Sequence, residues 1–201
     1  MANIVWQTAP QMKNYQIQVS LKNISPKIWR RLLIPADIPL QDFHKVIQTS
    51  MGWWNYHLHQ FMKDGKYYLE KTEYDDFWDE MVHVDYSQLK LSDLLMQEND
   101  KIGYEYDFGD GWLHDIVLEK ILDPDPGVIY PQCVAGKRNC PPEDCGGAYG
   151  YSNFLKIIAN PRDKEYKETM EWVGGSFDPE SFDKKAINDL LKEDDFGTPS
   201  Y

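Results

Sequence analysis

The chain lacks the long apolar stretch that a membrane-spanning helix needs. No run of roughly eighteen apolar residues occurs among its 201 residues. The N-terminus also lacks the basic stretch followed by an apolar one that marks a secretory signal. Cysteine is scarce: there are three, an odd number, which fits a reducing compartment better than a disulfide framework. We therefore expect a cytoplasmic protein with no membrane partner.

Basic residues are also few. Lys and Arg number 21 against 33 Asp and Glu, which gives a net charge of −12. A field of that sign repels phosphate backbones, so nucleic-acid binding is not expected over most of the surface. The best local basic cluster is Lys27, Arg30 and Arg31. A solvated edge strand is the preferred interpretation of this cluster, and an accessory protein that touches DNA is the alternative.

The chain does contain many apolar and aromatic residues. Hydrophobic residues make up 42% of the sequence and aromatic residues 14%, which indicates a globular protein rather than a disordered one. The length suits one substantial core. We expect a single domain over residues 1–201, with a sheet-plus-helix core over 13–122, a Cys/Pro/Gly loop over 123–150 and C-terminal helices over 151–195.

Periodicity predicts the elements of that core. Residues 15–21 and 28–34 are strand-like and are joined by turn residues, which predicts a hairpin. Apolar residues recur at helical spacing from Leu40 to Met51, and Gly52 is a natural helix stop. Further strands are predicted over residues 57–62, 67–69, 104–108 and 112–121. The predicted fold is α+β: a mainly antiparallel sheet crossed by a helix, β-grasp-like in layout.

The C-terminal part changes to helical spacing. One short helix is predicted to stop at Pro161 and a second to end at Gly174. A third is predicted to begin at Asp178-Pro179, with Asp as N-cap and Pro at the first helical position. These helices are too short to bury a core alone, so we expect them to form an extension packed on the sheet.

The stretch from Tyr104 to His114 is the most informative in the chain. Aromatic and acidic residues alternate up to Phe108, and Asp110-Gly111 predicts a type I′ turn. In that register Asp107 lies across from His114. The aromatic rings then share one face of the hairpin, and a carboxylate–imidazole pair lies on the other.

Histidines near this hairpin suggest a polar site. His57 and His59 are two residues apart, so on a strand they project from one face. Such side chains bind divalent cations, and a bound metal can activate water for hydrolysis. Alternatively, the histidines hydrogen-bond around the Trp-rich helix end and Asp110 caps its own turn. The candidate polar site comprises His57, His59, Asp107, Asp110 and His114.

The three cysteines are a second candidate metal site. Cys133, Cys140 and Cys145 lack the two-residue spacing of a zinc knuckle, so zinc would need a further ligand. Buried free thiols are the commoner outcome. In the same loop, Glu143 and Asp144 are adjacent and point apart, and we expect one of them to bond backbone amides or an Arg.

Six segments taken together resemble the plasmid pRiA4b ORF-3-like family, which includes passenger proteins of insertion elements. The resemblance covers roughly residues 13–192. It implies a mixed α/β single domain found mainly in prokaryotes, on mobile elements and chromosomes, with no established activity. The segments that carry it are residues 15–21, 28–31, 40–53, 57–59, 106–114 and 140–147.

Two functions follow as hypotheses. The first is a noncatalytic binding or accessory module associated with mobile elements, in which the sheet presents the Trp/His/Asp region to a protein partner. Its anchors would be the aromatics Tyr74, Phe77 and Trp78, since such rings dominate interface energetics. The alternative is a small metal-dependent hydrolase that uses the His/Asp cluster. No cofactor is certain; zinc or another divalent metal is the one these residue types favour.

Overall fold

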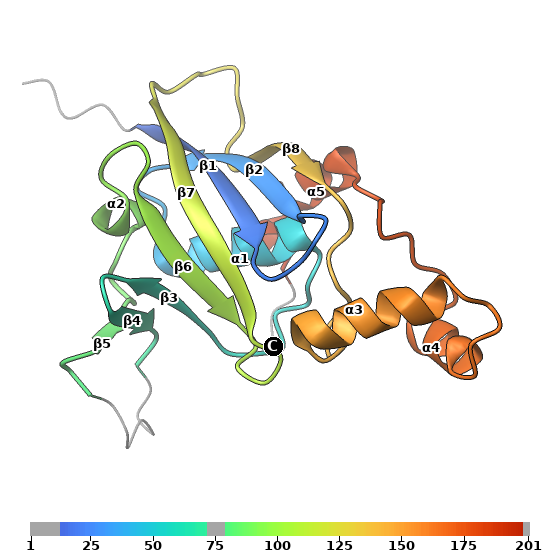
Figure 1. Cartoon of the computed structure of the whole chain (residues 1–201). Coiled ribbons are helices and arrows are strands. Elements are labelled where there is room, and N and C mark those ends of the chain that lie inside the picture. Colours follow the sequence, from blue (N-terminus) through green and yellow to red (C-terminus); the bar gives the residue numbers. More distant parts are fainter. Residues whose placement is uncertain (1–12, 72–78, 199–201) are drawn as a thin grey trace, which may run out of the picture.

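One eight-stranded sheet forms the frame of the molecule (Figure 1). The computed structural model describes residues 13–71 and 79–198. The strands lie in the order β5-β4-β3-β6-β7-β1-β2-β8, and every pair is antiparallel except β4–β5. The strands are β1 (Asn14–Leu21), β2 (Trp29–Pro35), β3 (His59–Lys63), β4 (Lys66–Leu69), β5 (His83–Asp85), β6 (Lys101–Tyr106), β7 (Trp112–Leu122) and β8 (Gln132–Lys137).

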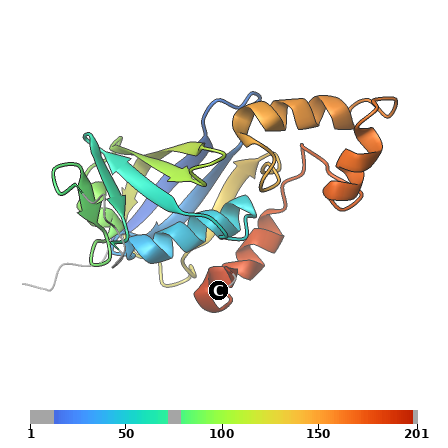
Figure 2. The ribbon, with the colours of Figure 1, turned by 90° about the horizontal axis from the view of Figure 1, so that it is seen from below.

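Helix α1 lies across one face of this sheet, as the hairpin–helix–strand order predicts (Figure 2). Its apolar stripe, including Leu40 and Phe43, is fully buried, and Gly52 ends it in the left-handed conformation. No helix in the described part of the chain is long and apolar enough to cross a membrane. The helices are α1 (Leu40–Met51), α2 (Leu91–Leu94), α3 (Gly147–Ile158), α4 (Tyr166–Trp172), α5 (Lys184–Leu190) and the 3₁₀ helix η1 (Asp194–Gly197).

The C-terminal helices attach at two places. Helix α5 contacts β8 and α1, and η1 contacts α1. Helices α3 and α4 pair with each other and extend beyond the end of the sheet (Figure 1). The predicted start of α5 at Asp178 is wrong. The helix begins at Lys184, because the Asp183 carboxylate accepts the Ala186 amide and caps it there.

Two strands were not predicted. Residues 83–85 form β5, and residues 132–137, inside the predicted Cys/Pro/Gly loop, form β8. Because β8 pairs with β2, the basic cluster does not lie on an edge strand. Arg30 is buried, with its guanidinium donating to the carbonyls of Ser50 and Lys137, and Arg31 makes a two-bond ion pair with Glu119. Both side chains therefore serve the packing of the sheet.

Aromatic and imidazole rings with polar atoms meet between α1 and the sheet. His44 stacks on His59 with ring centroids 3.4 Å apart, and its Nδ1 lies 2.8 Å from the Tyr104 hydroxyl. His114 faces the same interior and is fully buried. Burial lowers the pKa of His44 and of His114 from the ordinary 6.5 to about 4. Both imidazoles are therefore neutral in the folded protein at neutral pH.

These depressed values predict acid sensitivity. Between pH 6.5 and 4 these histidines bind protons in the unfolded chain but not in the folded chain. Their contribution to the free energy of unfolding is therefore fully present above pH 6.5 and is lost as the pH falls toward 4. Each such histidine contributes up to about 1.4 kcal/mol per pH unit. We expect His114→Phe to flatten this slope in urea unfolding between pH 4.5 and 6. At pH 7 to 8 its slope should match the unchanged protein, and an unaltered slope between pH 4.5 and 6 would contradict the assignment.

Candidate functional site

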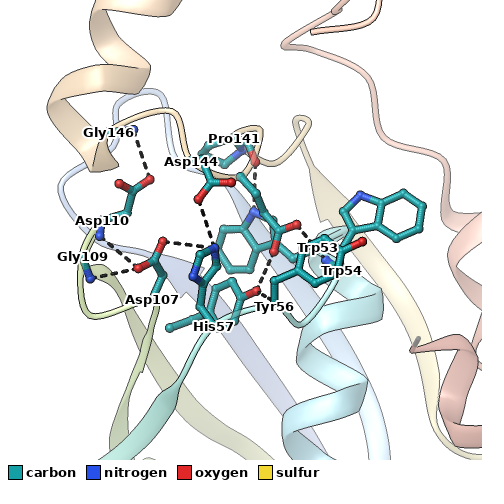
Figure 3. A network of polar contacts seen from close by, with 12 residues as sticks. Trp53, Trp54, Tyr56, His57, Asp107, Gly109, Asp110, Pro141, Asp144 and Gly146 are labelled. Atoms are coloured by element: carbon teal, nitrogen blue, oxygen red, sulfur yellow. Dashed lines mark hydrogen bonds and ion pairs between the residues drawn. The ribbon is translucent and has the colours of Figure 1, made fainter. Parts of the chain in front are cut away.

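Three segments distant in sequence meet where β6 ends (Figure 3). They are residues 53–58 before β3, the β6–β7 turn at residues 107–111, and the loop at residues 140–147, which precedes and begins α3. Hydrogen bonds and ion pairs join each segment to another. The site is therefore built by tertiary contacts rather than within one hairpin.

The β6–β7 turn differs from the predicted one. Tyr106 pairs with Trp112 and Tyr104 with His114, so the predicted pairing of Asp107 with His114 is wrong. Asp107 instead adopts a positive φ of 58°, and its Oδ1 accepts the amides of Gly109 and Asp110. Through these two bonds the Asp107 side chain stabilises a five-residue loop, residues 107–111, where a two-residue turn at Asp110-Gly111 was predicted. The imidazole of His114 consequently faces the core.

Tyr106, the last residue of β6, anchors the polar network. Its hydroxyl lies 2.5 Å from Glu143 Oε1, to which it donates, and it accepts the Tyr56 amide at 3.0 Å. Burial, and then the bond to Glu143, hold the pKa of Tyr106 far above its ordinary 10, so the phenol stays protonated and can donate. Glu143 Oε2 accepts the Trp54 amide, which confirms the expectation that one acid of this loop bonds a backbone amide.

Trp53 contacts both Tyr106 and the loop at residues 140–147. Its indole Nε1 donates to the Pro141 carbonyl at 2.9 Å, and its ring stacks on Tyr106 with centroids 5.1 Å apart. The same ring contacts His114 edge-on. The end of α1 is thereby tied both to the sheet and to the loop at residues 140–147.

Asp110 and Gly147 fix the loop to the turn. Asp110 Oδ2 accepts the Gly146 amide at 3.1 Å. Gly147 has a φ of 65°, and a Cβ built there would lie 2.3 Å from the Asp110 carbonyl oxygen. The two chains approach so closely that only glycine fits.

Beside this network, His57 faces two carboxylates (Figure 3). Its Nε2 lies 3.1 Å from Asp144 Oδ1 and 3.6 Å from Asp107 Oδ2. Within the described ranges this is the only group of three or more His, Cys, Asp or Glu side chains whose ligand atoms all lie within 4.8 Å of one another. One imidazole and two carboxylates can hold a divalent cation.

The other predicted site residues do not belong to this group of three. His59 Nε2 lies 2.7 Å from the Tyr86 hydroxyl, and Asp110 binds Gly146. Cys133 and Cys140 are buried and Cys145 half-buried, all as free thiols. Burial raises their pKa values to about 11, 12 and 12, which keeps the thiols protonated in the metal-free protein. Among the described residues, no cysteine belongs to a group of three potential metal ligands. Tyr74, Phe77 and Trp78 fall outside the described residues.

Sequence reasoning missed Asp144 as the third member of the group and Trp54 as an exposed aromatic beside it. The only signal for Asp144 is its place in the Cys140–Gly147 segment, which says nothing about His57. Trp54 and Tyr56 are each 58% exposed, and Phe108 is 46% exposed. Exposed rings therefore lie in two of the segments that form the polar network.

The fold and site define an acidic α+β protein with a His/Asp cluster at the end of an antiparallel sheet. The chain belongs to a family described as plasmid pRiA4b ORF-3-like protein, whose sequence profile matches residues 13–186.

Two relatives can be compared directly. The uncharacterized protein y4hQ of Sinorhizobium fredii is 35% identical over 175 residues, which cover 86% of this chain and 85% of that one. A crystal structure of a protein of unknown function from Methanosarcina mazei Go1 matches with a TM-score of 0.77 and 38% identity, covering 87% of this chain and 97% of that one.

Because the backbone of Gly147 lies so close to the Asp110 carbonyl, we expect a single added methyl group at residue 147 to lower the stability of the protein strongly. Gly147→Ala should destabilise the protein by about 2 kcal/mol more than Gly175→Ala in urea unfolding. Gly175 is the matched control, since its φ is also positive, at 92°, but nothing lies within 4 Å of a Cβ there. If both variants lost the same free energy of unfolding, the close contact between Gly147 and the Asp110 carbonyl would not contribute to the effect.

Proposed function

We propose that this protein is a noncatalytic binding module whose ligand occupies the cavity between residues 51–54, the loop at 139–143 and the end of α4. The supporting observation is the cavity itself, whose volume is about 470 Å³. That size falls within the range of natural ligand sites. Its walls include the indoles of Trp54 and Trp172, which are 58% and 50% exposed. Trp54 points away from the polar network (Figure 3).

The charge of the cavity indicates the class of ligand. Glu143 is the only charged residue among those that line it. Aromatic faces beside a carboxylate attract ammonium and guanidinium groups. The net charge of −12 favours the approach of a basic partner. The ligand we propose is a Lys- or Arg-containing segment of a partner protein.

This proposal is tested with a peptide of alternating Gly and Arg against one of alternating Gly and Glu. We expect saturable binding of the basic peptide only, measured by calorimetry. Trp54→Ala and Trp172→Ala should each weaken binding about tenfold. Tyr149→Ala is the control, because Tyr149 is 89% exposed and does not line the cavity. No saturable binding, or an equal loss in Tyr149→Ala, would refute the proposal.

Cellular context is part of the proposal. The family is described by an open reading frame of a plasmid, which supports an accessory role on mobile elements. The three free thiols support a cytoplasmic location.

The second candidate is a metal-dependent hydrolase, favoured by the group of His57, Asp107 and Asp144. Of the residues first expected in such a site, His57 and Asp107 remain and Asp144 joins them. A metal held there would lower the pKa of a bound water. Hydrolysis of bis-p-nitrophenyl phosphate that requires Mn²⁺ and is lost in Asp144→Asn would favour this candidate. Equal rates in the protein and in Asp144→Asn would remove it.

A further inference from the structure

We propose that His57, Asp107 and Asp144 bind one divalent transition-metal ion, and that this ion fastens the loop at residues 140–147 to the end of the sheet. The three side chains come from the three segments that meet at the site. Metal binding here does not depend on the proposed binding function. It would hold whether or not the cavity takes a basic peptide.

The donor atoms are already close to the spacing a metal needs. Ligands about 2.1 Å from one ion lie about 3.0 to 3.4 Å apart in octahedral or tetrahedral arrangements. The distance from His57 Nε2 to Asp144 Oδ1 is 3.1 Å, and to Asp107 Oδ2 it is 3.6 Å. The three ligand atoms all lie within 4.8 Å of one another, so small side-chain rotations would bring them to the spacing of one coordination sphere.

His57 presents a buried nitrogen, Nε2, toward the two carboxylates. Nε2 is buried, and among the described residues no atom meets it with the geometry of a hydrogen bond, although two carboxylate oxygens lie near it. A buried polar atom without a hydrogen-bond partner lowers the stability of the fold unless another group or ion binds it. A metal ion between the nitrogen and the oxygens would do so.

Within the described ranges, neither Asp107 nor Asp144 pairs with a Lys or Arg that would balance its charge. The ion pairs found there for both carboxylates are those with His57. Asp107 is held rigidly, because its Oδ1 accepts two amides while its Oδ2 faces His57. Asp144 is 68% exposed at its side chain, so it is the member that a bound ion would immobilise.

The donor set indicates which ions fit. Ca²⁺ and Mg²⁺ prefer oxygen ligands alone, whereas Mn²⁺, Fe²⁺ and Zn²⁺ accept imidazole together with carboxylates. Three protein ligands leave coordination positions open to solvent or to a ligand oxygen. Two negative charges and a neutral imidazole match the charge of a divalent ion.

The test is a titration of the full chain, freed of metal with a chelator, with MnCl₂. Mn²⁺ is the probe because the three cysteine thiols do not favour it. We expect one ion per chain by calorimetry and by the loss of the free Mn²⁺ electron-spin-resonance signal. Asp144→Asn and His57→Gln should each weaken the affinity at least about tenfold.

Asp115→Asn is the matched control, because it removes one carboxylate charge from an exposed position on β7, where Asp115 pairs with Lys22. It should leave the Mn²⁺ affinity unchanged. The exposed position of Asp144 makes Asp144→Asn informative even if His57→Gln fails to fold. No binding at millimolar Mn²⁺, or equal affinity in Asp144→Asn, would overturn the proposal and leave a proton-mediated contact between His57 and the acids. Peptide binding measured in the chelator tests the cavity separately.

Discussion

The hydrogen bond from Tyr106 to Glu143 is the contact on which the site depends. It joins the last residue of β6 to a loop 37 positions later in the chain, and a carboxylate acceptor makes it stronger than a neutral bond. Burial keeps the phenol protonated, so the bond persists across the physiological pH range. Because Glu143 is turned toward Tyr106 and Trp54, its neighbour Asp144 is turned toward His57. Glu143 and Asp144 thus contact different segments of the site although they are adjacent in the chain.

The packing around this bond explains why the surrounding motifs have the residues they have. Trp53 follows Gly52, where α1 ends, and its ring stacks on Tyr106 while its indole Nε1 donates to the Pro141 carbonyl. Gly147 lets the loop touch the β6–β7 turn, where a side chain would collide with the Asp110 backbone. Trp53 and Gly147 therefore position the loop at residues 140–147 against the end of the sheet. The exposed aromatic rings of Trp54, Tyr56 and Phe108 lie in the same segments.

The sequence predicts those helices and strands whose residues follow a clear hydrophobic period and end at recognisable turn residues. The hairpin of β1 and β2, the helix α1 with Gly52 at its end, and the strands β6 and β7 all follow from period and turn residues. The strand β8 was missed because its alternation is weak and its partner β2 lies about a hundred residues earlier. In the β6–β7 turn the Asp-Gly signal was outweighed by the Asp107 side chain, which satisfies amides two and three residues on. Asp144 reaches His57 only through the fold, so no local pattern could have paired them.

A double-mutant cycle on Tyr106 and Glu143 tests the central claim most directly. The free energy of unfolding would be measured for Tyr106→Phe, Glu143→Ala and the double variant. If the bond holds the loop to the sheet, the two losses will be coupled by about 1 to 3 kcal/mol. Losses that add to within about 0.3 kcal/mol would mean that the two side chains act independently and would contradict the account.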